Sequence, residues 1–466
     1  MVRLNKNFNI LVIFLSLIAG AIRFFNINYA SLWADELYSA LLVRPGNSWY
    51  EILYTQRAYQ PPGYSMLLWL WTMLTGYNEF TIRLLSLIGG AMAVVVSAYL
   101  GKAVKNNQTG LLMAVLVVFN PTQIWYSLEA RFYIFVYILA ALSLLLYWPI
   151  MQKKPRSWSY YFLKSGIDAA LCYFHHFGII FVIGQFLFDV YLFYKDRDVF
   201  SLIRKTVGYF ISAILYLPWV LWGLLSGLAV KNYWLKEIDV YRFLSFNFGY
   251  TKYVSFLCLI AVIYFIITVI NKNFRQYLIF PLLCVIVTLV PYLYSVLRMP
   301  ILVDRYAMIL GPAFFLMLAI SIIELMRFVP RKVFRFALMT VLIFFSIQGF
   351  WMSFINPEPL KKQPWRQMAT WLVNQSDYIE TPVYSQGSII KGYFNLDFYL
   401  KEGKKATHLN FLIPGKDQKF YIVETNSIWQ VRDSVFQRID SLYTRTRQPF
   451  QSDNEFFGNI YICTIK

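Results

Sequence analysis

Long apolar runs occupy most of the first 356 residues and set the expected architecture. A helix that crosses a lipid bilayer needs about 20 mostly apolar residues. The segments of this length and character are 8–27, 82–104, 110–127, 131–150, 158–174, 176–195, 206–227, 251–271, 276–297, 303–326 and 333–355. No small-residue cleavage site follows the first run, so we interpret it as an uncleaved span rather than a signal peptide. The pattern predicts an all-α polytopic membrane bundle of about eleven transmembrane helices over residues 1–356.

Residues 62–77 form a shorter apolar stretch within the long loop 28–81. Pro61 and Pro62 stand at its start, and it is rich in Trp and Tyr, which favour the membrane interface. We therefore predict a helix that lies in or dips into the outer leaflet rather than a crossing.

The distribution of basic residues supports this topology. With a cytoplasmic N-terminus and eleven crossings, 17 Lys and Arg residues fall in the inner segments, whereas loop 28–81 holds only Arg44 and Arg57. A crossing at 62–77 would turn the basic loops outward, against the positive-inside rule. We expect a plasma (inner) membrane protein whose C-terminal part is periplasmic or extracellular.

Residues 357–466 lose the membrane character. Short apolar runs predict strands at 381–386, 407–412, 419–425 and 459–466. Amphipathic patterns predict helices at 364–375, 388–400 and 434–444. Strands that alternate with helices indicate a small extramembrane α/β domain.

The composition excludes several classes of protein. Hydrophobic residues make up 58% of the chain and charged residues 14%, and the mean hydropathy is +0.50, which argues against a disordered chain or a coiled coil. The net charge of +19 is spread between apolar segments, so no nucleic-acid partner is expected. The four cysteines show no CxxC or Cys/His spacing, which favours neither a zinc site nor a disulfide framework.

The loop after the first span carries the most informative polar residues. Asp35 and Glu36 stand between Trp33 and Leu37. Adjacent carboxylates in an apolar setting raise the pKa of one of them, which suits a general base. A solvated pair or a helix N-cap is the structural alternative.

Further polar motifs follow in a fixed order. They are Gln60-Pro-Pro-Gly-Tyr64, Arg83-Leu-Leu-Ser, Asn120-Pro, Tyr126-Ser-Leu-Glu129-Ala-Arg131 and Arg305-Tyr306. An early DE, then PPxY, G…RLxS, NP…YSxEAR and a late RY resemble the GT-C membrane glycosyltransferases. The similarity is greatest to the protein O-mannosyltransferase branch and its bacterial relatives, including the aminoarabinose transferases of lipid A. Those transferases usually have Lys where this chain has Gln60, so the resemblance leaves the sugar open.

The resemblance implies a GT-C bundle and an inverting glycosyltransferase. A sugar would move from a polyprenyl-phosphate donor to a hydroxyl of a lipid, glycan or protein acceptor at the outer membrane face. The leaving phosphate requires no metal, so no cofactor is expected. The implied catalytic residues are Asp35, as the base, and Glu36; the donor-phosphate ligands are Arg305, Arg131, Tyr306 and Arg83; the substrate-positioning residues are Glu129, Gln60, Tyr64, His175 and His176.

Several of these residues have structural alternatives. Arg305 could pair only with Asp304. Arg83 could anchor a helix end, and Glu129 with Arg131 could form an interfacial pair. The two histidines could be satisfied interface residues. Lys164 and Asp168, one helical turn apart, are interpreted as a pair buried within the bundle.

Two other functions compete with the transferase. A transporter or flippase of lipid-linked sugars should show repeated halves and broken helices at mid-membrane. Instead, no repeat is evident and the polar residues gather on one side. A structural scaffold would leave the cluster of carboxylates and arginines unexplained.

Overall fold

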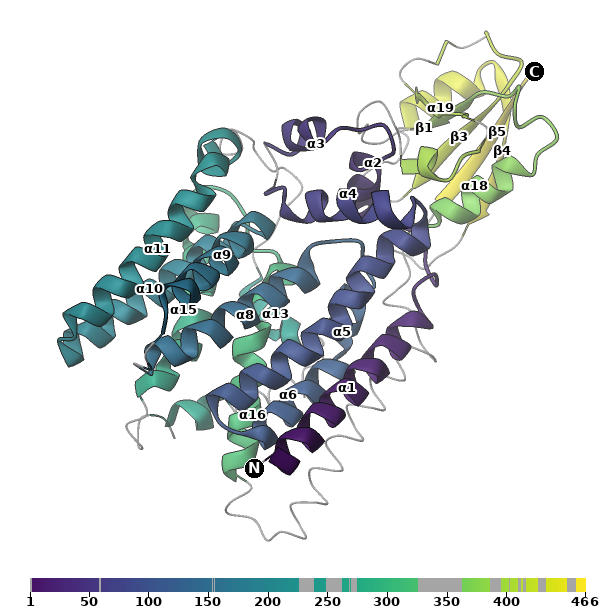
Figure 1. The fold of residues 1–466 in the computed structure, drawn as a ribbon. Coiled ribbons are helices and arrows are strands. Elements are labelled where there is room, and N and C mark those ends of the chain that lie inside the picture. The colour runs from purple at the N-terminus through teal and green to yellow at the C-terminus, as the bar shows by residue number, and fades with distance from the viewer. Residues whose placement is uncertain are drawn as a thin grey trace.

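The helices of the membrane part lie side by side in a computed structural model of the chain (Figure 1). The structure describes residues 2–57, 60–152, 154, 156–225, 239–248, 262–267, 269, 275–325, 363–385, 395–401, 403–409, 412–413, 416–425, 433–450 and 458–466. The long helices of the bundle are α1 (Val2–Phe24), α5 (Glu79–Val104), α6 (Asn107–Phe119), α8 (Tyr133–Met151), α9 (Trp158–Phe174), α10 (Phe177–Asp196), α11 (Val199–Trp219), α15 (Ile279–Leu297) and α16 (Gly311–Leu325).

Nine of the eleven predicted spans correspond to these helices. Among the described residues, seven helices are long and apolar enough to cross a membrane, whereas α6 and α9, with 13 and 17 residues, are shorter. The predicted span 333–355 lies outside the described residues, and so does most of 251–271, of which 262–267 and 269 are helical. The polytopic helical bundle is confirmed, without an exact helix count.

The predicted span 110–127 is two helices rather than one. Asn120 ends α6, and its side chain accepts a hydrogen bond of 3.0 Å from the Gln123 amide at the start of α7 (Pro121–Tyr126). Pro121 occupies the first helical position, where its missing N–H costs nothing. The break changes the direction of the chain before Glu129 and Arg131.

Small residues allow α5 and α6 to pack closely. A Cβ atom on Gly110 would lie 2.3 Å from the Ala98 carbonyl oxygen, and one on Gly101 would lie 2.8 Å from the Gly110 Cα. Contacts this short between backbones require glycine at both positions, a common way to pack membrane helices.

The predicted Lys164–Asp168 pair is confirmed as a buried ion pair between α8, α9 and α10. The Ser143 hydroxyl donates to Asp168 at 2.7 Å, and Lys164 donates to the Gln185 side chain at 2.7 Å. Each charged group therefore has further partners, which offsets the cost of placing it at membrane depth.

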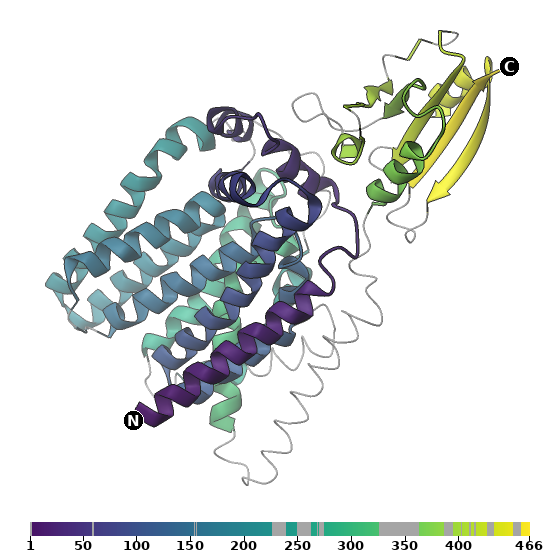
Figure 2. The same ribbon diagram turned by 45° about the vertical axis from the view of Figure 1, so that its right-hand side comes forward.

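Helix α4 (Gly63–Thr75) lies across one end of the bundle, beside α2 (Ala34–Leu42) and α3 (Trp49–Gln56), as both views show (Figures 1 and 2). Its 13 residues extend about 20 Å, which is too short for a hydrocarbon core of about 30 Å. This placement agrees with the predicted interfacial helix. The N-terminus of α1 lies at the opposite end (Figure 2).

The first prediction concerns orientation in the membrane. A reporter fused after Lys466 should be active outside the cytoplasm, and one fused after Lys105 should be active inside, because eleven crossings keep the basic loops in the cytoplasm. Paired phosphatase and fluorescent-protein fusions measure both. An exported Lys105 fusion would contradict the topology and make residues 62–77 a crossing.

The C-terminal part forms a mixed sheet of five strands, in the order β2-β1-β3-β5-β4, with helix α18 (Trp365–Val373) packed against it. The strands are β1 (Val383–Ser385), β2 (Thr407–His408), β3 (Lys419–Thr425), β4 (Tyr443–Phe450) and β5 (Gly458–Ile465). The α/β domain is confirmed, and its first part, α18, faces the end of the bundle that carries α2. The predicted boundary at 356/357 lies outside the described residues.

Two details of this domain differ from expectation. The predicted helix 434–444 ends at Asp440 (α19, Asp433–Asp440), and β4 follows directly where no strand was predicted. In the predicted helix 388–400, the described residues form a 3₁₀ turn, η8 (Asn395–Phe398). Edge strand β4 contains two arginines and Pro449. Charged residues and proline prevent an edge strand from pairing with another chain, and because they are untypical of strands, the sequence pattern did not predict β4.

Candidate active site

Helix α2 presents the Asp35-Glu36 pair at the end of the bundle near α4. The two carboxylates occupy its first turn, where the helix dipole stabilises negative charge. Successive residues of an α-helix point about 100° apart. The two side chains therefore enter different surroundings, and the structure separates their roles.

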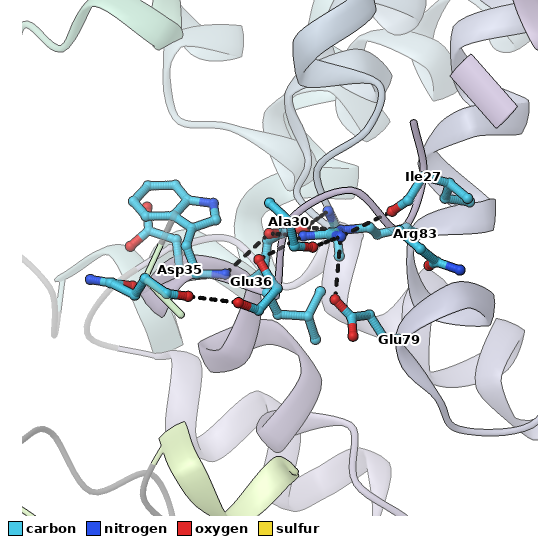
Figure 3. Close-up of polar contacts among 12 residues, drawn as sticks. Ile27, Ala30, Asp35, Glu36, Glu79 and Arg83 are labelled. Atoms are coloured by element: carbon cyan, nitrogen blue, oxygen red, sulfur yellow. Dashed lines mark hydrogen bonds and ion pairs between the residues drawn. The ribbon is translucent and has the colours of Figure 1, made fainter. Parts of the chain in front are cut away.

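Glu36 is fully buried and forms a two-point ion pair with Arg83 of α5 (Figure 3). Its Oε1 accepts hydrogen bonds from Arg83 Nε at 2.8 Å and the Ala130 amide at 2.9 Å. Its Oε2 accepts from Arg83 Nη2 at 2.8 Å and the Trp33 amide at 3.2 Å. With four bonds made, the carboxylate has little capacity left to take a proton from a substrate.

Arg83 directs its other donors to the chain just before α2. Nη1 donates to the carbonyl oxygens of Ile27 at 3.0 Å and Ala30 at 2.6 Å, and Nη2 donates to that of Ser31 at 3.0 Å (Figure 3). Nη1 also lies 3.4 Å from Glu79 Oε1. These contacts favour the structural alternative: Arg83 and Glu36 hold segment 27–36, and neither the predicted phosphate role of Arg83 nor the predicted catalytic role of Glu36 gains support.

Asp35 points to a different partner. Its Oδ2 lies 3.2 Å from Nη2 of Arg305, which belongs to the 3₁₀ helix η4 (Asp304–Leu310). The Asp35 side chain is 31% exposed, so the carboxylate is accessible. Asp304 instead pairs with Arg242, at 2.8 Å. The alternative in which Arg305 only neutralises Asp304 is therefore not what the structure shows.

Arg131 contacts the backbone of Asp35. Its Nη1 donates to the Asp35 backbone carbonyl at 3.2 Å and to Ser39 Oγ at 3.0 Å, while Nη2 donates to Gln60 Oε1 at 3.2 Å. The buried Nε of Arg131 has no hydrogen-bond partner among the described residues. Two guanidinium groups thus contact Asp35: Arg305 at its carboxylate and Arg131 at its backbone carbonyl.

Tyr64 and Glu129 belong to the same neighbourhood. A Cβ atom on Gly63 would lie 2.7 Å from the Tyr173 carbonyl oxygen, so glycine lets the start of α4 sit on the end of α9. Burial, with the Glu129 charge as a smaller contribution, raises the pKa of the Tyr64 hydroxyl, which Arg131 partly offsets. Both side chains are buried, and the charges of Arg131 and Glu129 act on the Tyr64 hydroxyl; their substrate-positioning roles stay predictions.

The two histidines have different surroundings. The His175 ring packs on Tyr306, with 4.3 Å between ring centroids. Its Nδ1 accepts from the Phe177 amide at 3.1 Å, which places the ring proton on Nε2. Burial lowers the pKa of His175, so the ring is neutral at pH 7. His176 instead contacts the Tyr216 hydroxyl at 3.3 Å, and the structure does not bring it to the carboxylate.

One buried cation was absent from the predicted site. Arg23 of α1 is completely buried and donates to Ser127 Oγ at 2.6 Å and to the Ala19 carbonyl at 3.1 Å. A Cβ atom on Gly90 would lie 2.6 Å from Arg23 Nε, so this glycine makes room for the guanidinium. Arg23 therefore fixes the turn that leads from α7 to Arg131. An arginine inside an apolar span was the available signal.

The fold and the site define a polytopic membrane protein with an accessible carboxylate paired with one arginine and a second arginine bound to the same residue's backbone, an arrangement suited to an anionic substrate and a proton transfer. The family model for dolichyl-phosphate-mannose-protein mannosyltransferase matches residues 59–222. A comparison with curated protein sequences gives no match.

Solved structures share the fold of the chain. ArnT from Cupriavidus metallidurans in the apo state matches with a TM-score of 0.66 and 12% identity, covering 96% of this chain and 97% of that one. The same protein bound to undecaprenyl phosphate matches with a TM-score of 0.63, at the same identity and coverage. The archaeal oligosaccharyltransferase AglB from Archaeoglobus fulgidus, in complex with an inhibitory peptide and a dolichol-phosphate, matches with a TM-score of 0.55 and 14% identity over 80% of this chain and 58% of that one. The resemblance to GT-C membrane glycosyltransferases, in fold and in the family of the matched segment, is confirmed.

Proposed function

We propose that the chain is an inverting glycosyltransferase that moves a sugar from a polyprenyl-phosphate donor to an acceptor hydroxyl at the outer face of the plasma membrane. The observation that carries the proposal is the accessible Asp35 carboxylate, which pairs with Arg305, while Arg131 binds the backbone carbonyl of the same residue. The names of the similar proteins support a lipid-phosphate donor, since one solved relative binds undecaprenyl phosphate and another a dolichol-phosphate.

In this proposal Asp35 acts as the general base. The acceptor hydroxyl attacks the anomeric carbon, and its proton passes to the Asp35 carboxylate. The new bond joins the acceptor oxygen to that carbon, while the bond from carbon to phosphate oxygen breaks. The electron pair leaves with the prenyl phosphate, and the anomeric configuration inverts.

The two arginines bind the donor phosphate and stabilise the charge that it gains on leaving. A guanidinium offers paired donors that match two phosphate oxygens. Arg305 now contacts Asp35, so a phosphate bound to Arg305 would release the carboxylate to meet the acceptor. Tyr306 follows Arg305 and is held by the His175 ring, which keeps this part of η4 in place.

An apolar cavity beside α13 (Val240–Ser245) suits the prenyl chain. It has a volume of about 590 Å³ and lies between α13, α15 and α16. Val240, Thr288, Tyr292 and Met317 are among the residues that line it. Helix α13 packs on η4, which carries Arg305. A lipid bound here would have its apolar chain in the cavity and its phosphate near the arginines.

The proposal also assigns the parts of the chain. Residues 1–356, including the outer loop 28–81, form the glycosyltransferase domain, and residues 357–466 form a periplasmic or extracellular domain. The N-terminus is cytoplasmic. The acceptor is a lipid, a glycan or a protein with a free hydroxyl.

Purified protein in liposomes tests this function directly. Donors made of labelled sugars on undecaprenyl phosphate should release prenyl phosphate when extracts of outer-envelope acceptors are added. The competing flippase would move the intact donor between leaflets without breaking the sugar–phosphate bond. Translocation without cleavage would therefore replace the transferase by the flippase.

The second prediction separates a phosphate ligand from a simple positive charge. Arg305→Lys should weaken binding of the prenyl-phosphate sugar about tenfold to a hundredfold, because an ammonium keeps the charge but loses the paired donors. A charge-assisted hydrogen bond contributes about 1.5–3 kcal/mol. Donor titration by calorimetry measures the change.

Arg242→Lys is the matched control for this experiment. Arg242 is 63% exposed and pairs with Asp304, the neighbour of Arg305, so its replacement should leave donor affinity unchanged. Full affinity in Arg305→Lys would remove Arg305 from the phosphate site and leave Arg131 as the remaining candidate.

A further inference from the structure

The chain just before Asp35 is held from two sides. On the membrane side, Arg83 binds carbonyl oxygens of segment 27–31. On the other side, the C-terminal domain binds the same stretch from residues more than 300 positions away. A loop fixed in this way has little freedom to move relative to the bundle.

The contacts from the C-terminal domain are mostly to backbone atoms. Ser31 Oγ donates to the Gln363 carbonyl at 2.7 Å. The Leu32 amide donates to the Tyr399 hydroxyl at 2.7 Å. Arg366 of α18 donates to the Asn28 carbonyl at 3.1 Å. The contacts at Leu32 and Asn28 use backbone atoms of the loop and depend on where the loop lies, whereas the contact at Ser31 also uses its hydroxyl.

Gln363 makes a contact of a different kind. Its Oε1 accepts a hydrogen bond of 3.0 Å from the amide of Ala34, the first residue of α2. The first amides of a helix have no partner inside the helix and are normally capped by a preceding Ser, Thr, Asp or Asn. Trp33 precedes α2 and provides no side-chain cap. Gln363, which is 4% exposed, therefore supplies part of the cap from another domain.

We propose that Gln363 is a positioning residue for Asp35, and this inference rests on the proposed function. Asp35 follows the capped amide directly, so the direction of its carboxylate depends on the first turn of α2. The bond from Gln363 fixes this turn against Arg305 and Arg131. The C-terminal domain is thereby part of the active site without contacting the substrate.

The third prediction tests this role by kinetics. Gln363→Ala should lower kcat for sugar transfer about tenfold to a hundredfold, since displacement of a catalytic group by about 1 Å costs on the order of 10²-fold. The KM for the donor should stay within about twofold, because neither proposed phosphate ligand contacts Gln363. Gln363→Glu should recover most of kcat, since it keeps the acceptor oxygen and adds a charge favourable at a helix N-terminus.

Controls separate positioning from general destabilisation. Gln375→Ala removes a glutamine of the same domain whose side chain, among the described residues, bonds to the Trp371 carbonyl one helical turn earlier, and it should behave as wild type. Tyr399→Phe removes only the hydroxyl that accepts from Leu32. It should lower kcat less than Gln363→Ala and serves as the informative variant if Gln363→Ala does not fold.

Hydrogen exchange gives a readout that does not depend on activity. The amides of residues 32–36 should exchange faster in Gln363→Ala than in wild type, and at the wild-type rate in Gln363→Glu. Amides 32–36 that exchange at the wild-type rate in Gln363→Ala would overturn the inference. So would a Gln363→Glu enzyme whose kcat for sugar transfer is as low as that of Gln363→Ala. If the wild-type protein transfers no sugar, the proposed function fails, while the exchange rates still decide whether Gln363 holds α2.

Discussion

Asp35→Asn is expected to lower the rate of sugar transfer by about 10²–10⁴-fold, the usual cost of losing a general base. An amide has the shape of the carboxylate but cannot take the proton of the acceptor hydroxyl. Asp35 is partly exposed and, within the described part of the chain, forms one ion pair, so the folded protein should tolerate the change. Donor affinity should stay the same or rise, because Arg305 loses its competing carboxylate.

Single-turnover transfer with saturating donor measures this effect. Asp304→Asn is the matched control, since it removes a carboxylate on η4 that pairs with Arg242, and it should retain transfer. Wild-type turnover by Asp35→Asn would show that the base lies elsewhere, and Glu129 would be the next residue to test.

Glu36→Gln is expected to have an equally large effect, but on stability. The change removes the charge that neutralises Arg83 in a buried site. It also turns an NH₂ group toward donors that Glu36 now accepts from. Breaking a buried ion pair by removing one partner costs about 3–5 kcal/mol. The purified variant should unfold at a clearly lower temperature or fail to form monodisperse protein.

The variant Glu79→Gln provides the comparison for Glu36→Gln. Its side chain is 15% exposed and lies 3.4 Å from Arg83 and 3.1 Å from Arg366, so Glu79→Gln should destabilise the protein much less. Thermal unfolding in detergent, followed by size-exclusion chromatography, compares the variants. A Glu36→Gln protein that is as stable as wild type but inactive would restore the catalytic role predicted from the sequence.

The membrane part of the fold follows closely from the apolar pattern. Runs of about 20 apolar residues have few alternatives to a helix in a bilayer, and nine predicted spans coincide with helices. The aromatic residues and short length of α4 both predict a helix at the interface rather than a crossing. The break at Asn120-Pro121 escaped prediction, since hydropathy averages over a local kink.

The site could be predicted as a region but not as a set of contacts. The order of motifs pointed to α2, the loop around Arg131 and η4, and the structure brings these together. Sequence alone could not assign separate roles to Asp35 and Glu36, because adjacent residues of a helix point to different partners that are distant in the chain. Their partners lie 270 and 47 positions away, on η4 and α5. The bond from Gln363 spans 329 positions and carried no local signal.

The buried Arg23 has a consequence for how the protein is made. Its partner Ser127 follows 104 positions later in the chain, and no carboxylate of the described residues pairs with it. At about 5–20 residues per second, helix α1 waits roughly five to twenty seconds in the translocation channel or bilayer before that partner is synthesised. During this interval the guanidinium can reach water at the membrane surface. The bond to Ser127 can form only after α7 has been made, so the turn that leads to Arg131 is fixed later than α1.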